Sequence, residues 1–307
     1  MSRFFEAIWF DTKWFHYFFI ILFLPISILW AVFMIVRRFL AIRENFEIPI
    51  ISIGNLQIGG TGKTPFIIEL ASNFKNAYIV SRGYGRKSNG LIQVSKNGKL
   101  FSDVNASGDE AYLMAVSINK SNVIVSEDRR AGIEFAKVQG ADVIFLDDGF
   151  NQVNIEKFEI LLKPSKVTNY FPIPSGPFRE PFWYEKKADI VAQEDIDFKR
   201  VVTFENLTPS MILVTAIANP ARLDRFLPKG VVQKYYFDDH AYFNKEKLLE
   251  LLAQNGAMSL LVTEKDAVKM SSFKLPISKM RLKLEIKQSI MKKIDEFIKG
   301  YKNGTKH

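Results

Sequence analysis

The sequence has 307 residues, 48% of them hydrophobic, and its 42 lysines and arginines against 33 aspartates and glutamates give a net charge of +9. The apolar content excludes a disordered chain, and the length allows two modest domains with hydrophobic cores. The absence of cysteine excludes disulfides, thiol nucleophiles and Cys-ligated metal sites, and three histidines argue against a multi-His site. The positive charge favours anionic partners such as lipid headgroups, phosphates or nucleic acid.

Segment 14–36 near the N-terminus contains 23 residues without a formally charged side chain. As a helix it would be about 34 Å long, enough to cross a hydrocarbon layer of about 30 Å. Arg37 and Arg38 follow, so the positive-inside rule places the rest of the chain on the cytoplasmic side. A cleaved signal peptide is disfavoured because the run is too long and no small-residue cleavage site follows it. We predict a membrane anchor over residues 1–38 and favour a spanning helix over one lying in the interface, which Pro25 would tolerate.

Short apolar runs alternate with helical patterns over residues 39–165. Strands are predicted at 50–53, 77–80, 122–125 and 143–146, and helices at 64–74, 110–119 and 131–139. Continuous apolar strands separated by helices predict an α/β fold in which a parallel sheet is flanked by helices.

A Pro/Gly-rich stretch at 164–181 interrupts this alternation and is either a domain boundary or a long functional loop. Beyond it, strands are predicted at 211–218, 231–237 and 259–262, and helices at 244–254 and 288–299. Residues 166–307 are therefore predicted to form this connection and a smaller C-terminal α/β lobe.

A glycine-rich segment follows the first predicted strand. It reads Gly54-Asn55-Leu56-Gln57-Ile58-Gly59-Gly60-Thr61-Gly62-Lys63-Thr64. Glycines let such a loop turn its N–H groups inward, and the following helix N-terminus adds positive charge, so residues 59–64 are predicted to bind nucleotide phosphates. Lys63 would contact the β- and γ-phosphates and Thr64 would ligate Mg²⁺. The strict motif requires glycine where this chain has Gln57, but the order of elements still predicts a P-loop NTPase-like core.

Two adjacent carboxylates, Asp147 and Asp148, follow the predicted strand 143–146. Ligands bind at the carboxyl ends of the strands in open α/β sheets. The Mg²⁺ of a nucleotide needs hard oxygen ligands opposite the phosphate loop, and either aspartate can supply one directly or through water. The alternative is a plain Asp-Gly turn made with Gly149. We favour the metal role.

Several short motifs occur along the chain in a characteristic order and spacing. They are Gly54-Asn55 with Gly59-Gly60-Thr61-Gly62-Lys63-Thr64-Pro65, Ser81-Arg82-Gly83-Tyr84-Gly85, Gly108-Asp109-Glu110, Asp128-Arg129, Asp147-Asp148-Gly149, Pro174-Ser175-Gly176-Pro177-Phe178-Arg179-Glu180-Pro181, Ala218-Asn219-Pro220, Asp239-His240 and Thr263-Glu264-Lys265-Asp266. Together they resemble the tetraacyldisaccharide 4′-kinase family of lipid A biosynthesis. The resemblance covers most of the chain after the anchor and includes an N-terminal membrane helix before the phosphate loop.

The resemblance implies transfer of the ATP γ-phosphoryl group to the 4′-hydroxyl of a tetraacyl glucosamine disaccharide 1-phosphate, with ATP and Mg²⁺ as cofactors. It implies a position at the cytoplasmic face of a Gram-negative inner membrane. It also points to Asp109 as the base for the hydroxyl proton, paired with His240, and adds Lys63 to the catalytic residues. A basic, membrane-attached protein suits a lipid acceptor that carries a phosphate. No nucleic acid or obligatory protein partner is expected.

The chain departs from the family pattern at two places. Where the family typically has Gln-His after Asp-Asp-Gly-x, this chain has Asn151 and Gln152. Many members carry two adjacent histidines where Ala241 follows His240 here. Any part that the missing histidines play in the family is therefore in doubt for this chain.

Three arginines, Arg82, Arg129 and Arg179, are candidates for binding an anionic group of the acceptor or the nucleotide. Guanidinium groups suit phosphate oxygens, although unassigned arginines are usually solvated or paired with carboxylates. Without the resemblance, Asp109 would be interpreted as a helix N-cap. The stretch Thr263–Asp266 has the same alternative as the cap of the helix that follows.

A rival function is a membrane-attached NTPase switch in which hydrolysis drives assembly or partner release without an acceptor. Dimerising ATPases of that kind carry a lysine just before Gly-Gly-x-Gly-Lys-Thr, where this chain has Ile58. A nucleic-acid-binding protein is suggested only by the charge, and no basic stripe interleaved with aromatic residues supports it. The sequence therefore predicts a P-loop lipid kinase.

Overall fold

The computed structural model describes residues 3–59, 61–217, 220–239, 241–302 and 304. The chain forms two compact units, each assembled from separated stretches of sequence. The first unit comprises Met1–Lys63, Val143–Phe198 and Ile286–His307, and the second comprises Thr64–Asp142 and Lys199–Glu285. The chain therefore passes from one unit to the other within the predicted phosphate loop motif, between Lys63 and Thr64.

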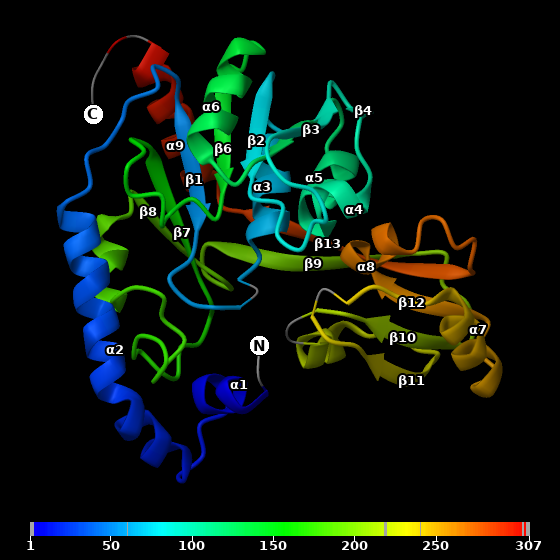
Figure 1. Cartoon of the computed structure of the whole chain (residues 1–307). Helices are drawn as coiled ribbons and strands as arrows, with labels where there is room; N and C mark the ends of the chain where they lie inside the picture. Colours follow the sequence, from blue (N-terminus) through cyan, green and yellow to red (C-terminus); the bar gives the residue numbers. More distant parts are fainter. Residues whose placement is uncertain (1–2, 60, 218–219, 240, 303, 305–307) are drawn as a thin grey trace. The chain divides into compact units, whose positions relative to one another are not determined.

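The core of the first unit is a parallel sheet with the strand order β6-β1-β7-β8 (Figure 1). Its strands are β1 (Ile50–Gly54), β6 (Val143–Asp147), β7 (Phe158–Lys163) and β8 (Ile190–Gln193). Every residue of β1 and β6 is buried, as their continuous apolar sequences indicate for a sheet covered on both faces. The register sets Ile53 opposite Asp147, so the carboxyl ends of β1 and β6 lie side by side.

Helix α9 (Gln288–Lys302) packs with one apolar face against the first unit. Ile290, Ile294 and Ile298, spaced four residues apart, are buried. The ring of Phe297 lies 4.8 Å, between centroids, from that of Phe158 on β7. Lys292, Lys293 and Lys299 of the same helix are exposed.

Two N-terminal helices, α1 (Arg3–Phe10) and α2 (His16–Phe39), belong to the same unit (Figure 1). One side of α2 is buried and carries His16, Ile20, Ser27 and Met34. Most of its remaining apolar side chains are exposed, with Leu29 at 71%. By length and composition, α2 is apolar enough to cross a membrane.

The Pro/Gly-rich stretch 164–181 lies within the first unit and contains only isolated β-bridges among its described residues. It leads into the short 3₁₀ helix η1 (Phe182–Lys187).

The second unit contains a mixed sheet with the strand order β4-β3-β5-β2. Its strands are β2 (Ala77–Ser81), β3 (Ile92–Lys96), β4 (Lys99–Leu100) and β5 (Asn122–Val125), and the associated helices are α3 (Lys63–Ala71), α4 (Val104–Ser107), α5 (Asp109–Ser117) and α6 (Arg129–Val138). β2 and β5 pair in parallel, whereas β3 pairs antiparallel with β5 and β4.

The same unit contains a separate sheet with the strand order β11-β10-β12-β13-β9 (Figure 1). Its strands are β9 (Phe198–Glu205), β10 (Met211–Thr215), β11 (Val231–Tyr236), β12 (Ser259–Thr263) and β13 (Ile277–Ile286), and it is accompanied by η2 (Pro220–Phe226), α7 (Lys245–Gln254) and α8 (Glu264–Lys269). Leu248 and Leu252 of α7 pack with Ile212 of β10 and Leu260 of β12 in one buried cluster. The predicted α/β class with a smaller C-terminal sheet is confirmed.

Candidate active site

The predicted phosphate loop lies between the end of β1 and the start of α3. Gly59 and Gly62 have φ angles of +116° and +88°, a region that favours glycine, so the turns of the loop need these residues. Asn55 closes the loop from inside, because its Nδ2 donates to the carbonyl oxygens of Gln57 at 2.6 Å and of Gly59 at 3.4 Å. Thr61 is buried in the loop, and the predicted ligand Gly60 lies outside the described residues.

Gln57 occupies the position where the strict motif has glycine, and the structure explains why it fits. The flanking backbone is extended and paired with the chain near Pro177: the amide of Ile58 donates to the Pro177 carbonyl, and the amide of Arg179 donates to the Leu56 carbonyl, both at 2.8 Å. An extended backbone accepts any side chain, so this departure from the motif leaves the loop intact.

Lys63 lies at the centre of a polar cluster in the first unit. Its Nζ is 2.9 Å from Asn55 Oδ1 and 3.5 Å from Asp148 Oδ1. Arg179 reaches the same two partners, with Nη1 2.7 Å from Asp148 Oδ2 and Nη2 3.3 Å from Asn55 Oδ1. Burial raises the pKa of the Asp148 carboxyl, but the charges of Lys63 and Arg179 outweigh it and hold that pKa below its ordinary value.

The two predicted metal ligands at the end of β6 differ in their surroundings. Asp147 is the last residue of the strand and is buried, whereas Asp148 has φ +53°, which a non-glycine residue rarely adopts. Gly149 follows in close contact with β1, since an added Cβ would lie 2.7 Å from Ser52 Oγ. The structure therefore contains the Asp-Gly turn, with a strained backbone at Asp148, and the turn places the Asp148 carboxylate beside Lys63.

No group of three or more His, Asp and Glu side chains suited to a metal ion occurs in the part of the chain that the structure describes. The predicted Mg²⁺ ligands Thr64, Asp147 and Asp148 are hydroxyl and carboxylate oxygens, which this hard cation prefers. A nucleotide-bound Mg²⁺ keeps several waters and phosphate oxygens and needs only one or two protein ligands, so this donor set fits it.

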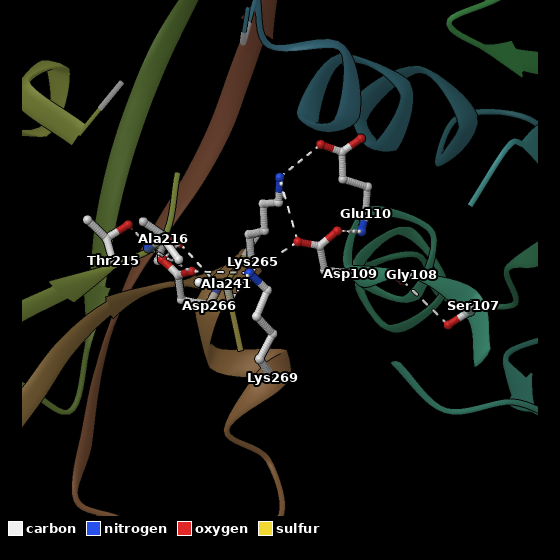
Figure 2. Close-up of polar contacts among 11 residues, drawn as sticks. Ser107, Gly108, Asp109, Glu110, Thr215, Ala216, Ala241, Lys265, Asp266 and Lys269 are labelled. Carbon is white, nitrogen blue, oxygen red and sulfur yellow. Dashed lines mark hydrogen bonds and ion pairs between the residues drawn. The ribbon is translucent and has the colours of Figure 1, made fainter. Parts of the chain in front are cut away.

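Asp109 lies in a second charged cluster, in the second unit (Figure 2). Its N-cap is Gly108, with φ +85°, so Asp109 is the first residue of α5 and not its cap. The Asp109 carboxylate is buried, and its Oδ2 lies 3.2 Å from Lys269 Nζ and 3.7 Å from Lys265 Nζ. Lys265 is closer to Glu110, at 3.0 Å.

Thr263 caps α8, because its Oγ1 accepts from the amide of Asp266 at 3.2 Å. The capping role predicted for Thr263–Asp266 is thus confirmed. In addition, Lys265 and Asp266 form ion pairs within the second charged cluster. Burial lowers the pKa of Lys265, yet the charges of Glu110 and Asp109 outweigh it and raise that pKa. Burial raises the pKa of Asp266, which its hydrogen-bond donors oppose only in part.

The remaining predicted site residues are dispersed. Arg82 is exposed just after β2, whereas Arg129 is buried at the start of α6, where its Nη1 donates to the carbonyl of Ser126. Arg179 is the arginine that lies beside Lys63. His240 lies outside the described residues.

The family model for tetraacyldisaccharide-1-P 4′-kinase matches residues 19–299. The chain belongs to this family. It is 48% identical over 284 residues to the tetraacyldisaccharide 4′-kinase of Helicobacter acinonychis, covering 92% of this chain and 90% of that protein. It is 45% identical over 306 residues to the enzyme of the same name from Aliarcobacter butzleri, covering 97% of each. The resemblance on which the sequence prediction rests is confirmed.

Among solved structures, the kinase resembles LpxK from Aquifex aeolicus, described as an "apo" form in complex with ATP. The two share 27% identity with a TM-score of 0.76, covering 91% of this chain and 99% of the other. The predicted fold, enzyme class and nucleotide cofactor agree with this likeness.

A groove of about 430 Å³ in the first unit of the kinase joins the apolar helix α2 to the Lys63 cluster. Trp30, Phe33 and Met34 line it on the helix side, and Asp148 and Arg179 line it on the polar side. A surface that is apolar at one side and charged at the other suits an amphiphilic ligand.

Sequence reasoning missed Asn55 and Lys269 as parts of the two clusters. In the sequence, Asn55 stands out only as part of a motif, although a polar residue at a buried strand end before a glycine-rich loop is a signal for loop closure. Lys269 carries no local signal, because its partner Asp109 is far away in sequence. Only the packing of α5 against α8 brings them together.

Proposed function

We propose that the chain uses Lys63, Arg179 and the phosphate loop to bind ATP and uses Asp109 to accept the proton of the acceptor hydroxyl. The reaction is that of its family: transfer of the ATP γ-phosphoryl group to the 4′-hydroxyl of a tetraacyl glucosamine disaccharide 1-phosphate. The observation that carries this conclusion is the match of residues 19–299 to the family model, and the glycine-rich turns before Lys63 support it. A nucleotide switch without an acceptor is not favoured.

On the donor side, residues 59–64 would hold the phosphates, and Lys63 would contact the β- and γ-phosphates. Lys63 and Arg179 both form ion pairs with Asp148, and phosphate oxygens can replace the Asp148 carboxylate as the partner of these two cations. Thr64 with Asp147 or Asp148 would hold Mg²⁺, which neutralises charge developing on the phosphate oxygens.

On the acceptor side, the oxygen of the 4′-hydroxyl forms a bond to the γ-phosphorus while the bond from that phosphorus to the β–γ bridging oxygen breaks. The hydroxyl proton passes to the Asp109 carboxylate, and ADP leaves with the bridging oxygen. His240 is proposed as the partner of Asp109, on the family resemblance alone. Arg82 and Arg129 stay predictions for contacts to anionic groups of the acceptor.

The sequence alone favours a spanning helix, but from the contacts of α2 we propose instead that it lies in the membrane interface and does not span the bilayer. Residues on both sides of it are fixed to the same unit: Trp9 Nε1 donates to the Pro174 carbonyl at 2.8 Å, and Arg38 Nε lies 2.5 Å from Glu180 Oε2. Between these points, the Ser175 amide donates to Ser27 Oγ at 3.0 Å. A spanning helix would have lipid around its length, whereas only one side of α2 is open to lipid.

The face of the membrane follows from the donor. ATP is a cytoplasmic substrate, so we place the enzyme at the cytoplasmic face of the inner membrane of a Gram-negative bacterium. The exposed apolar side of α2 provides the attachment and keeps the active site near a lipid acceptor.

The function is tested by acceptor-dependent ATP turnover with radiolabelled ATP. We expect the disaccharide 1-phosphate lipid to stimulate turnover and to acquire the label on its 4′-oxygen. Hydrolysis of ATP at the same rate without the lipid would instead support the nucleotide switch.

The position of α2 is tested by labelling single cysteines, since the chain has none of its own. Trp14, before α2, is 85% exposed, and Val138, on the surface of α6, is 80% exposed. With a membrane-impermeant maleimide, Trp14→Cys should react in inverted inner-membrane vesicles, as Val138→Cys does. Reaction of Trp14→Cys only from the opposite side of the membrane would show that α2 spans.

A further inference from the structure

Lys269 is a buried cation placed between two carboxylates. It ends α8, and its side chain is only 1% exposed. Its Nζ lies 3.2 Å from Asp109 Oδ2 and 3.8 Å from Asp266 Oδ1 (Figure 2). Taking an ammonium group out of water is costly, so a charge in this position depends on the carboxylates around it.

The carboxylate of Asp266 is the fixed member of this arrangement. It is fully buried and accepts hydrogen bonds from Thr215 Oγ1 and Thr263 Oγ1, both at 2.7 Å, and from the Ala216 amide at 3.2 Å. These donors come from the end of β10 and the N-cap of α8. Asp266 is thus attached to the sheet and holds Lys269 at a defined place beside Asp109.

Lys269 also connects Asp109 with the segment that carries His240. Its Nζ donates to the carbonyl of Ala241 at 3.3 Å and lies 5.7 Å from the centre of the Phe243 ring. One ammonium group therefore contacts the proposed base, a sheet-anchored carboxylate and the residue that follows the proposed histidine partner.

Lys265 provides an internal comparison, because it lies four residues before Lys269 on the same face of α8. Its Nζ is closer to Glu110, at 3.0 Å, than to Asp109, at 3.7 Å, and its side chain is 18% exposed. Lys269 is nearer to Asp109 and more deeply buried. Of the two lysines, Lys269 is the one placed to control Asp109.

We propose that Lys269 is a positioning residue for Asp109, which it keeps ionised and in one orientation while Asp266 holds Lys269 in place. This inference rests on the proposed function of Asp109 as the base. A base must be ionised before the hydroxyl proton arrives, and a neighbouring cation favours that form. Lys269 thereby sets the pH range over which Asp109 can act.

Other titratable groups also face Asp109 in the described part of the chain. They include Glu110 on α5, Lys265 on α8 and Tyr242, and Asp239 acts on the same cluster through Lys265. Burial raises the pKa of the Tyr242 hydroxyl, and the negative charge of Asp109 raises it further. Glu110 and Tyr242 cannot supply positive charge, whereas Lys265 and Lys269 both place a cation within 4 Å of the Asp109 carboxylate.

The test is the pH profile of kcat for Lys269→Met, measured with ATP and the lipid acceptor. We expect kcat to fall about tenfold with little change in the KM for ATP, because the change affects the chemical step. The acidic limb of the profile should move upward by about one pH unit, because the carboxylate loses a stabilising cation. Lys269→Arg should restore most of this shift. The matched control Lys247→Met removes an exposed lysine of α7 and should leave the profile unchanged.

Removal of Lys269 takes its positive charge away from two buried carboxylates, so we expect the variant also to lose stability. The double variant Lys269→Met/Asp266→Asn removes one of these charges and should recover thermal stability. Under the proposal its kcat stays low and its acidic limb stays displaced. If kcat and the acidic limb of the pH profile both returned to their wild-type values in the double variant, Lys269 would have a merely structural role and the inference would be overturned.

Asp109→Asn, measured in parallel, separates this inference from the proposed function. Loss of activity in Asp109→Asn together with a wild-type profile in Lys269→Met would overturn the role of Lys269 alone. Full activity in Asp109→Asn would remove the base assignment, and the positioning role would fall with it.

Discussion

The two charged clusters of this kinase both pair lysine with aspartate but differ in how exposed these side chains are. In the first unit, the side chains of Lys63, Asp148 and Arg179 are 15%, 33% and 29% exposed. In the second, those of Lys269 and Asp109 are 1% and 6% exposed. An open ion pair is weak and can be exchanged for a ligand, whereas a sealed one holds its geometry. The first cluster therefore suits binding of phosphates, and the second suits orientation of a catalytic group.

The largest effect is expected from Lys63→Ala, which should lower lipid phosphorylation by about a thousandfold, because under the proposed function it removes a cation that contacts the phosphates. The rate of label transfer from ATP to the lipid measures this loss. Lys75→Ala, which changes an exposed lysine just beyond α3, serves as the control. Near-normal transfer by Lys63→Ala would contradict the binding role of the open cluster.

Asp109→Ala should have the next largest effect and should leave nucleotide binding nearly intact. Loss of a general base costs about a hundredfold or more in kcat. Because the contacts to ATP are assigned to the other cluster, the affinity for ATP measured by equilibrium titration should change little. An equal loss in ATP affinity and in kcat would show that nucleotide binding and proton transfer are not assigned to separate clusters.

The smallest effect is expected in the stability of Asp266→Asn as a function of pH. The folded pKa of Asp266 is raised above its ordinary value of 3.8, so the folded chain holds this proton more tightly than the unfolded chain. The resulting stabilisation is fully present below pH 3.8 and is lost as the pH rises through the folded pKa. The melting temperature of the wild type should therefore fall, relative to that of Asp266→Asn, by a few degrees between pH 4 and pH 7. A constant difference over that range would show that the pKa of Asp266 is not raised by folding.

Much of the parallel sheet architecture was predictable because continuous apolar runs between helices have few other structural solutions. The strand predicted at 122–125 coincides with β5, and that at 50–53 is one residue shorter than β1. The hairpin of β3 and β4 was missed, although Asn97-Gly98 adopts positive φ angles at both positions and is a known signal for a two-residue turn. β13 was also missed. This strand is only partly buried, so its alternation of apolar and polar residues is a weaker signal than the continuous apolar run of a buried strand.

The candidate site was predictable where its chemistry is local in sequence. The glycine loop, Lys63 and the pair Asp147-Asp148 each carry a signal within a few residues. The contact of Lys265 with Glu110 joins positions 155 residues apart, and only the fold brings them together. Asp109 by itself looked like a cap, and its burial between two lysines was not visible in the sequence.

The hydrogen bonds that attach the end of α2 to the rest of the first unit matter for attempts to prepare a soluble form of this enzyme. Arg37 Nη2 donates to the carbonyl of Asn151 at 2.8 Å, and Arg38 Nη2 donates to that of Phe150 at 2.9 Å. These carbonyls belong to the turn that begins with Asp148. Deleting residues 1–38 would therefore remove two contacts that hold this turn, so a shortened enzyme with low turnover would have lost more than its attachment to lipid.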